Sequence, residues 1–152
     1  MKVYSICKCE FITDLHGTGA ARFPGRWNSK GTYILYTAAT ASLALLESVV
    51  HVSNIAVSSY CMVCLSLPDD SIQTISANEL PENWYTNPAP DMLKNIGDSF
   101  IKTNKFLLLK IPSAIMPEEN SFLLNPAHPD FKKVEVVYTR NIPIDERFIK
   151  HT

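Results

Sequence analysis

Short apolar runs, each ended by proline, glycine or a polar turn, constrain the fold of this 152-residue chain more than any other feature. Runs of about four to eight β-branched, aromatic and apolar residues with such boundaries are typical of β-strands. We expect strands over residues 2–7, 32–36, 59–67, 71–75, 105–111, 121–124 and 134–139. A chain with this many short strands builds a sheet as its centre.

Two segments have the spacing of helices. Residues 41–51 form an apolar run without proline or glycine, and residues 91–104 repeat apolar side chains on one face, at Leu93, Ile96 and Phe100. Residues 13–30 are polar and contain glycine, so we expect a long loop there. Strands and helices in mixed order predict an α+β fold. The length predicts one domain over residues 1–152.

The amino-acid composition argues against some classes of binding partner. Charged residues make up 19% of the chain and the formal net charge is -1, so a general attraction to nucleic acid or to an anionic membrane is not expected. The sequence opens without a signal peptide, and its apolar runs are shorter than the roughly 18 residues of a membrane span. We therefore expect a soluble cytoplasmic protein whose partner is a small molecule or another protein.

The four cysteines form two close pairs, Cys7 with Cys9 and Cys61 with Cys64. Zinc sites of this composition usually present thiolates from tight turns, whereas Cys61 and Cys64 would point to opposite faces of a strand. We expect reduced, partly buried thiols rather than a metal site.

Residues 25–36 carry an arginine, an amide and several aromatic side chains in a loop that leads into a strand. Glu47 follows in the apolar helical segment, where a buried carboxylate needs a partner. Either a functional site or a structural ion pair would explain it. Arg26 is the candidate partner, for Glu47 or for a ligand phosphate, because its planar guanidinium binds oxyanions through two parallel hydrogen bonds.

Other motifs are weaker. Gly17-Thr18-Gly19 lacks the third glycine and the strand–helix context of a dinucleotide fingerprint. Ser113 follows a strand that Pro112 ends, where its hydroxyl would bind a ligand or cap the next turn. His128 lies in a turn rich in proline, where a histidine is usually structural. The sequence lacks a P-loop, a nucleophile elbow and a His-Glu-x-x-His motif.

Taken in order, several segments resemble the RES domain, a family named for its arginine, glutamate and serine. The matching segments are Gly25-Arg26-Trp27-Asn28-Ser29-Lys30-Gly31, Tyr36-Thr37, Leu43-Ala44-Leu45-Leu46-Glu47, Val50-His51, Ile96-Gly97-Asp98, Leu109-Lys110-Ile111-Pro112-Ser113-Ala114 and Leu124-Asn125-Pro126-Ala127-His128-Pro129-Asp130-Phe131. The resemblance covers nearly the whole chain.

This resemblance implies a toxin of a bacterial toxin–antitoxin pair, held inactive by an antitoxin with an Xre-type helix-turn-helix domain. It also implies a mixed β-core with flanking helices, similar to ADP-ribosyltransferase toxins. The implied activity is NAD degradation by cleavage of the nicotinamide–ribose bond, through hydrolysis or phosphorolysis and without a metal. Some family members instead transfer ADP-ribose to a protein. A homodimer is compatible with these properties.

By the same resemblance, Glu47 would stabilise the oxocarbenium-like transition state and Arg26 would hold the diphosphate of NAD. Tyr36 would orient the nicotinamide side, Ser113 would hydrogen-bond the substrate, and Asn28 would belong to the NAD-binding set.

The chain departs from the family in its first strand, where Ser5 occupies a position usually held by arginine. Serine lacks the charge that would make a second cationic contact with NAD, a loss of about 1.5–3 kcal/mol. The alternative interpretation is therefore an attenuated or inactive relative that binds NAD or protein.

Overall fold

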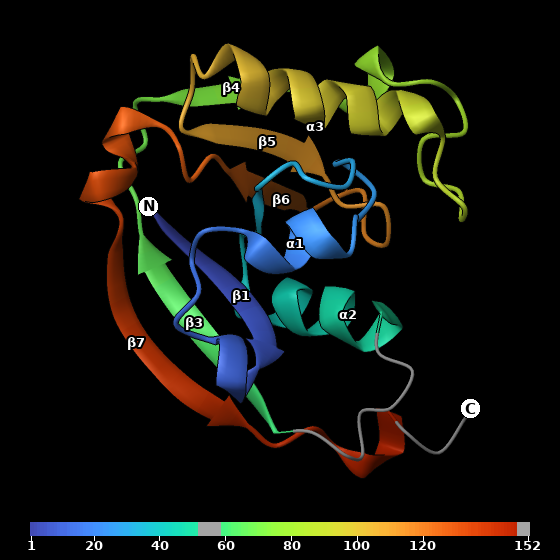
Figure 1. Cartoon of the computed structure of the whole chain (residues 1–152). Coiled ribbons are helices and arrows are strands. Elements are labelled where there is room, and N and C mark those ends of the chain that lie inside the picture. The colour runs from blue at the N-terminus through green and yellow to red at the C-terminus, as the bar shows by residue number, and fades with distance from the viewer. Residues whose placement is uncertain (52–58, 149–152) are drawn as a thin grey trace.

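Strands dominate the computed structural model of the chain, which describes residues 1–51 and 59–148 (Figure 1). Within these residues the strands are β1 (Lys2–Lys8), β2 (Leu35–Ala38), β3 (Tyr60–Ser66), β4 (Ile72–Thr74), β5 (Leu108–Pro112), β6 (Asn120–Leu124) and β7 (Glu135–Ile142). They form one seven-stranded sheet in the order β4-β5-β6-β2-β1-β3-β7. The β4–β5 pair is parallel and the other pairs are antiparallel, so the sheet is mixed. The predicted α+β class is confirmed.

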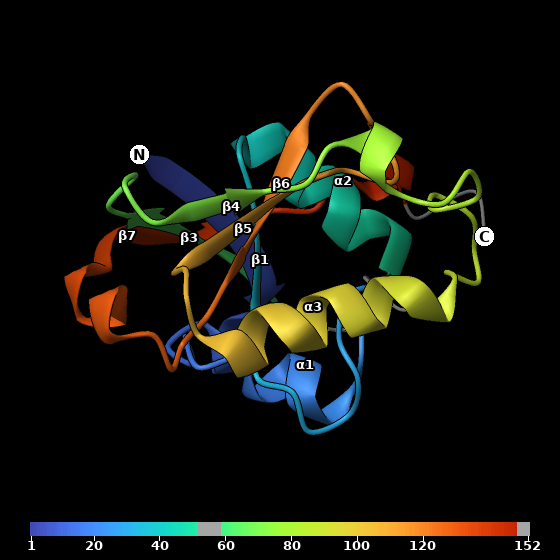
Figure 2. The same ribbon diagram turned by 90° about the horizontal axis from the view of Figure 1, so that it is seen from above.

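Helices pack on this sheet. The α-helices of the described residues are α1 (Thr18–Arg22), α2 (Ala41–His51) and α3 (Asp91–Thr103), and the 3-10 helices are η1 (Cys9–Phe11), η3 (Ala77–Glu79), η4 (Pro129–Lys133) and η5 (Glu146–Phe148). Seen from above, α3 lies along β5 and the segment around α1 lies on the same side as α3 (Figure 2). No helix of the described residues is long and apolar enough to cross a membrane.

The two faces of the sheet bury separate apolar clusters. Val3, Leu65 and Leu124 belong to the cluster on one face, whereas Tyr4 and Ala38 point to the other face and pack against α2. The cluster beneath α3 includes Leu93, Phe100, Leu109, Ile111 and Leu123. Strand β3 is buried from Tyr60 to Leu65, and its Val63 and Leu65 belong to the same cluster as Val3.

The predicted elements overlap the observed ones, but several boundaries differ. Strand β5 begins at Leu108 rather than at residue 105, and β7 ends at Ile142 rather than at residue 139. Strand β2 begins at Leu35 and ends at Ala38, so the predicted range 32–36 was about three residues early. The predicted loop 13–30 contains the short helix α1, which starts after Gly17 in a left-handed conformation with φ of 75°. The two predicted α-helices are present over nearly the expected ranges.

Candidate active site

Helix α2 presents Glu47 at the edge of the apolar cluster that it covers. The helix starts where the Thr40 hydroxyl accepts a hydrogen bond from the Leu43 N–H at 3.1 Å. Leu43 and Ala44 bury one side of α2 against the sheet, and Glu47 lies one turn further along, half-buried. One carboxylate oxygen, Oε1, accepts a hydrogen bond of 2.7 Å from the Ser113 hydroxyl. Helix packing therefore fixes the backbone and Ser113 fixes the carboxylate.

Ser113 lies directly after β5 and is 1% exposed. Its oxygen accepts hydrogen bonds from the N–H groups of Ile115 at 3.2 Å and Met116 at 3.1 Å, which closes the turn after the strand. Its single hydroxyl hydrogen goes to Glu47. The turn cap expected as one alternative for Ser113 is present, and the same atom also holds the carboxylate.

Arg26 is anchored by backbone carbonyl oxygens of the segment before α3. Its Nη1 donates to the carbonyl oxygens of Trp84 at 2.9 Å and Thr86 at 2.8 Å. Burial lowers the pKa of Arg26, while the charge of Glu47 acts in the opposite direction. In residues 1–51 and 59–148 no ion pair within 4.0 Å joins Arg26 to Glu47. The remaining N–H donors of Arg26 make no hydrogen bond to the described residues.

Tyr36 on β2 stabilises the loop that carries Arg26. Its hydroxyl accepts a hydrogen bond from the Trp27 N–H at 3.0 Å and donates one to Asn28 Oδ1 at 2.7 Å. Gly25 also donates its N–H to Asn28 Oδ1, at 2.9 Å, and a Cβ on Gly25 would lie only 2.8 Å from the Tyr36 hydroxyl oxygen. Burial raises the pKa of Tyr36, so the phenol stays neutral.

Asn28 is fully buried at the centre of this loop. Its Nδ2 donates to the carbonyl oxygens of Ala20 at 2.8 Å and Thr32 at 3.2 Å. These two hydrogen bonds tie α1 to the end of the loop that carries Arg26. The side chain has no surface left for a ligand in this structure. Its contacts are those of a group that holds the Arg26 loop in shape.

Helix α3 closes the loop from the other side, through residues to which the sequence analysis gave no role. The Asp98 carboxylate accepts the Ser29 N–H at 2.9 Å. A Cβ on Gly97 would lie 1.6 Å from the Trp27 carbonyl oxygen, so only glycine allows this approach. A glycine at a buried position of an amphipathic helix was the signal available in the sequence.

The cysteines differ from the expectation of reduced thiols. Cys9, the first residue of η1, and Cys61 on β3 form a disulfide, although the strand register places Cys7 opposite Cys61. Cys7 and Cys64 are free. The described residues contain no group of three or more His, Cys, Asp or Glu side chains that could hold a metal ion. His128 has the structural role expected, since its Nδ1 accepts the N–H of Asp130 at 3.1 Å.

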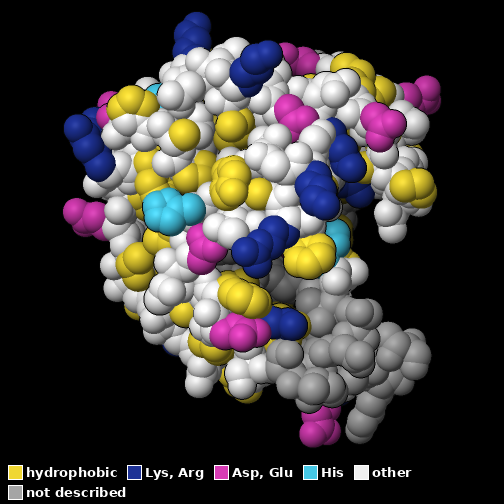
Figure 3. Space-filling view, viewed as in Figure 1, with side chains coloured by type: hydrophobic (Ala, Val, Ile, Leu, Met, Phe, Trp, Pro, Cys, Tyr) yellow, Lys and Arg dark blue, Asp and Glu magenta, His cyan; other side chains and the backbone are white. Residues whose placement is uncertain are grey.

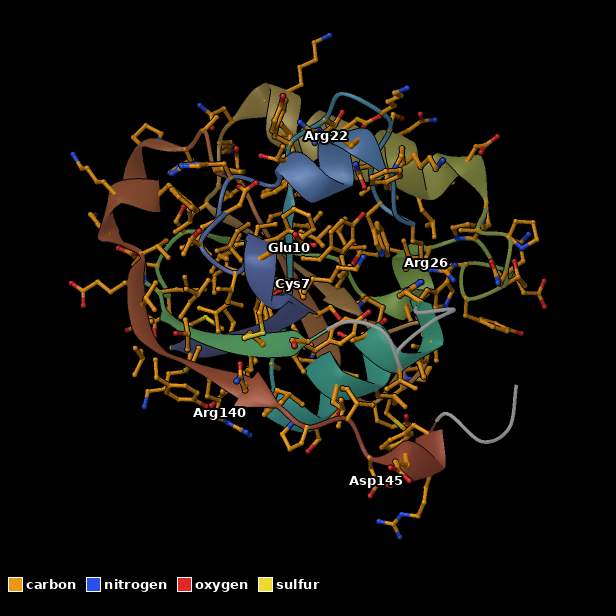
Figure 4. All side chains as sticks on the ribbon, turned by 60° about the horizontal axis from the view of Figure 1, so that its bottom comes forward. Cys7, Glu10, Arg22, Arg26, Arg140 and Asp145 are labelled. Atoms are coloured by element: carbon orange, nitrogen blue, oxygen red, sulfur yellow. A yellow bond between two sulfur atoms is a disulfide. The ribbon has the colours of Figure 1, made fainter. Side chains whose placement is uncertain are left out.

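Figure 3 shows the surface over this region. Lys and Arg side chains lie near the middle of the face shown, over α1 and the loop that follows it, with Asp and Glu side chains beside them. Arg26 lies beside the segment that joins η3 to α3 (Figure 4).

Comparison with known proteins gives consistent matches. A toxin named Res from Yersinia enterocolitica is 36% identical over 134 residues, which are 87% of this chain and 88% of that protein. The "Prs ADP-ribosylating toxin" of Sphingobium sp. is 36% identical over 142 residues, covering 90% of this chain and 88% of that protein. The fold is shared with a solved chain of the M. tuberculosis MbcT–MbcA toxin–antitoxin complex, with a TM-score of 0.76 and 14% identity over 93% of this chain and 83% of that chain.

The family model for the RES domain matches residues 2–147, which include all the site residues described above. The chain belongs to the RES domain family.

Proposed function

We propose that this RES-domain toxin consumes NAD by cleaving the bond between nicotinamide and ribose. The observation that supports the proposal most directly is the 2.7 Å hydrogen bond from Ser113 to Glu47, whose charge acts on the anchored guanidinium of Arg26. The second carboxylate oxygen of Glu47 makes no hydrogen bond to described residues. The fixed carboxylate suits a substrate that develops positive charge, and the fixed guanidinium, with N–H donors left over, suits a substrate that carries a diphosphate.

The chemistry follows from these charges. As nicotinamide leaves, positive charge develops on the ribose ring, and the Glu47 carboxylate stabilises it electrostatically. Arg26 holds the diphosphate with the donors that Trp84 and Thr86 leave free. Water or phosphate then attacks the anomeric carbon, giving ADP-ribose or its phosphate ester.

Tyr36, Ser113 and Asn28 have distinct parts in this proposal. Ser113 orients Glu47, because its hydroxyl donates its hydrogen bond to the carboxylate and not to the substrate. The Tyr36 hydroxyl is held by Trp27 and Asn28, so its contact with the nicotinamide side is made by the ring. Asn28 acts indirectly, by holding the loop that carries Arg26.

Incubation of the purified protein with NAD, with and without phosphate, tests the proposal. Release of nicotinamide with formation of ADP-ribose indicates hydrolysis. Faster loss of NAD with phosphate and formation of a phosphorylated ADP-ribose indicates phosphorolysis. If neither condition releases nicotinamide, the proposed activity is wrong for this chain.

A second candidate function is transfer of ADP-ribose to a protein. It is favoured by the 36% identity with the Prs ADP-ribosylating toxin, whose name states that activity. Labelled NAD added to a cell lysate with the toxin would give a labelled protein band. The Glu47→Gln variant serves as the control, since label that persists with this variant does not come from the proposed site.

The third candidate, an attenuated relative, depends on Ser5. In the register of β1, Ser5 lies opposite Val63 and therefore shares the sheet face of Val3 and Leu65, away from α2. A side chain at this position leaves the sheet on the side opposite to Glu47. An arginine on that face cannot contact a substrate bound at Glu47. We therefore expect Ser5→Arg to change NAD turnover less than about threefold, because a charge-assisted hydrogen bond contributes binding energy only when it reaches the substrate. A rise of tenfold or more would establish the attenuated interpretation.

The partner is proposed to be an Xre-type antitoxin in the bacterial cytoplasm, where NAD is found. An adjacent gene encoding a helix-turn-helix protein, and co-purification of its product with this chain, would support that assignment. Size-exclusion chromatography with light scattering would show whether the free toxin is a homodimer.

A further inference from the structure

Tyr85 is an exposed aromatic side chain beside the anchored arginine. Its neighbours in the chain, Trp84 and Thr86, supply the two carbonyl oxygens that accept hydrogen bonds from Arg26 Nη1, at 2.9 and 2.8 Å. The backbone of Tyr85 is therefore fixed with respect to Arg26 from both sides. Its side chain nevertheless remains 57% exposed.

The segment around Tyr85 is well ordered by its own contacts. The Trp84 N–H donates to the Pro81 carbonyl at 3.0 Å, and the Thr86 N–H donates to the Asn83 carbonyl at 3.1 Å. Trp84 is 6% exposed, and its ring meets the Tyr85 ring edge-on, at 6.0 Å between centroids and 87° between planes. The Tyr85 ring thus projects to solvent from a hydrogen-bonded turn whose neighbouring tryptophan is buried in the core.

An exposed ring next to a phosphate-binding arginine suits a nucleotide base. Aromatic side chains bind bases by stacking on them, and a base is joined to its diphosphate through one ribose. Arg26 is hydrogen-bonded to the segment that carries Tyr85, and the charge of Glu47 on α2 acts on the same guanidinium. If Glu47 faces the nicotinamide ribose and Arg26 holds the diphosphate, the part of NAD that extends beyond Arg26 is the adenosine half.

We propose that Tyr85 is the stacking surface for the adenine ring of NAD, and so determines the preference of the site for a dinucleotide. This inference rests on the proposed function, because it takes NAD as the substrate. It adds a binding subsite formed by the segment between η3 and α3.

The first test compares Tyr85→Ala with Tyr85→Phe. Loss of a stacking contact should raise the KM for NAD about fivefold to a hundredfold in Tyr85→Ala. Tyr85→Phe keeps the ring and should stay near the wild-type KM. Phe11→Ala provides a matched control, since Phe11 is 55% exposed on η1, a different part of the fold, and should leave KM unchanged.

The second test uses nicotinamide mononucleotide, which keeps the scissile bond but lacks the adenosine half. With this substrate, the KM of Tyr85→Ala should be close to that of the wild type, in contrast to the increase expected with NAD. A penalty of equal size with both substrates would overturn the proposal, because the lost contact would then lie on the nicotinamide side or in the fold. An unchanged KM for NAD in Tyr85→Ala would overturn it as well.

A binding measurement separates this inference from the proposed activity. Calorimetric titration of Glu47→Gln with ADP does not require turnover. The affinity should fall when Tyr85→Ala is added to that background and remain when Tyr85→Phe is added. If wild-type protein leaves NAD intact and yet binds ADP in a Tyr85-dependent way, the activity fails while the adenine subsite is supported. Equal ADP affinity in the Ala and Phe variants contradicts the subsite.

Discussion

Ser113 and Glu47 act as one unit at the scale of single residues. The serine uses its oxygen to close a turn and its hydrogen to hold the carboxylate, so the rotamer of Glu47 is linked to the end of β5. The other carboxylate oxygen, which makes no hydrogen bond to the described residues, is then held in one orientation. Preorganised charge of this kind costs no rearrangement when the transition state forms.

Replacing Glu47 by glutamine tests that role. Glu47→Gln keeps the shape and can still accept the Ser113 hydrogen bond, but it removes the negative charge. We expect nicotinamide release to fall by at least about a hundredfold, the usual loss for one preorganised electrostatic group. Chromatographic measurement of nicotinamide checks the rate, and thermal unfolding should show a midpoint close to the wild type. Retained turnover would return Glu47 to a structural role.

The sequence predicts Arg26, Glu47 and Ser113 as candidate site residues, but the residues alone leave Glu47 open between a site and an ion pair, and Ser113 open between a ligand contact and a turn cap. Their grouping follows from the resemblance to the RES domain, and on that basis a place near one another could be anticipated. The anchoring of Arg26 could not, because the carbonyl oxygens of Trp84 and Thr86 exist at every residue and have no sequence signature. The exposure of Tyr85 is likewise a product of packing around its buried neighbour.

At the scale of elements, the site depends on how α3 lies against the loop that carries Arg26. Gly97 permits the contact with the Trp27 carbonyl, and Asp98 adds the hydrogen bond to Ser29. The predicted range of α3 was correct because its apolar spacing is strong. The short helix α1 was missed because five residues containing a glycine carry little periodicity.

Gly97→Ala should destabilise the protein although alanine favours helices. The gain of about 1 kcal/mol in helix propensity is smaller than the cost of moving the Trp27 backbone away from a new Cβ, typically about 1–3 kcal/mol or more. Urea unfolding monitored by circular dichroism measures the difference. The control is Gly19→Ala in α1, where a Cβ would meet nothing within 4 Å, so that variant should be neutral or more stable.

The pH dependence of stability tests Asp98. Burial raises the pKa of Asp98, but hydrogen bonds from the Ser29 side chain and backbone outweigh burial, so its pKa lies below the usual aspartate value. A lowered folded pKa contributes stability that is present above the unfolded pKa of about 3.9 and is lost as the pH falls through the folded value. The stability difference between wild type and Asp98→Asn should therefore be constant near neutrality and shrink below about pH 4. A difference that grows on acidification would show that the carboxylate is not stabilising.

At the scale of the whole molecule, the disulfide links η1, which directly follows β1, to strand β3. Cys9 and Cys61 are separated by 52 residues, and the loop that they close contains β2 and α2. The sequence predicts four reduced thiols, because the spacing of cysteines alone does not show which strands become neighbours. Burial, followed by the nearby charge of Asp14, raises the pKa of Cys7 to about 11, so this adjacent thiol stays protonated and unreactive near neutral pH.

Reduction of this bond should lower the free energy of unfolding by about 2–4 kcal/mol, the range expected for closing a loop of this length. Urea unfolding with and without dithiothreitol measures the effect. Cys9→Ser should reproduce it under oxidising conditions, and Cys7→Ser should not. Equal stability with and without reductant would mean that the bond constrains nothing beyond what the sheet already fixes.

The bond between Ser113 and Glu47 also has a consequence for synthesis of the chain. These residues are 66 positions apart, and β6, which separates β5 from β2 in the sheet, follows both of them in the sequence. A ribosome that stops before residue 113 releases a fragment without the hydroxyl that orients the carboxylate. Translation products that end before residue 113 are thus expected to lack the oriented carboxylate, and with it the proposed activity.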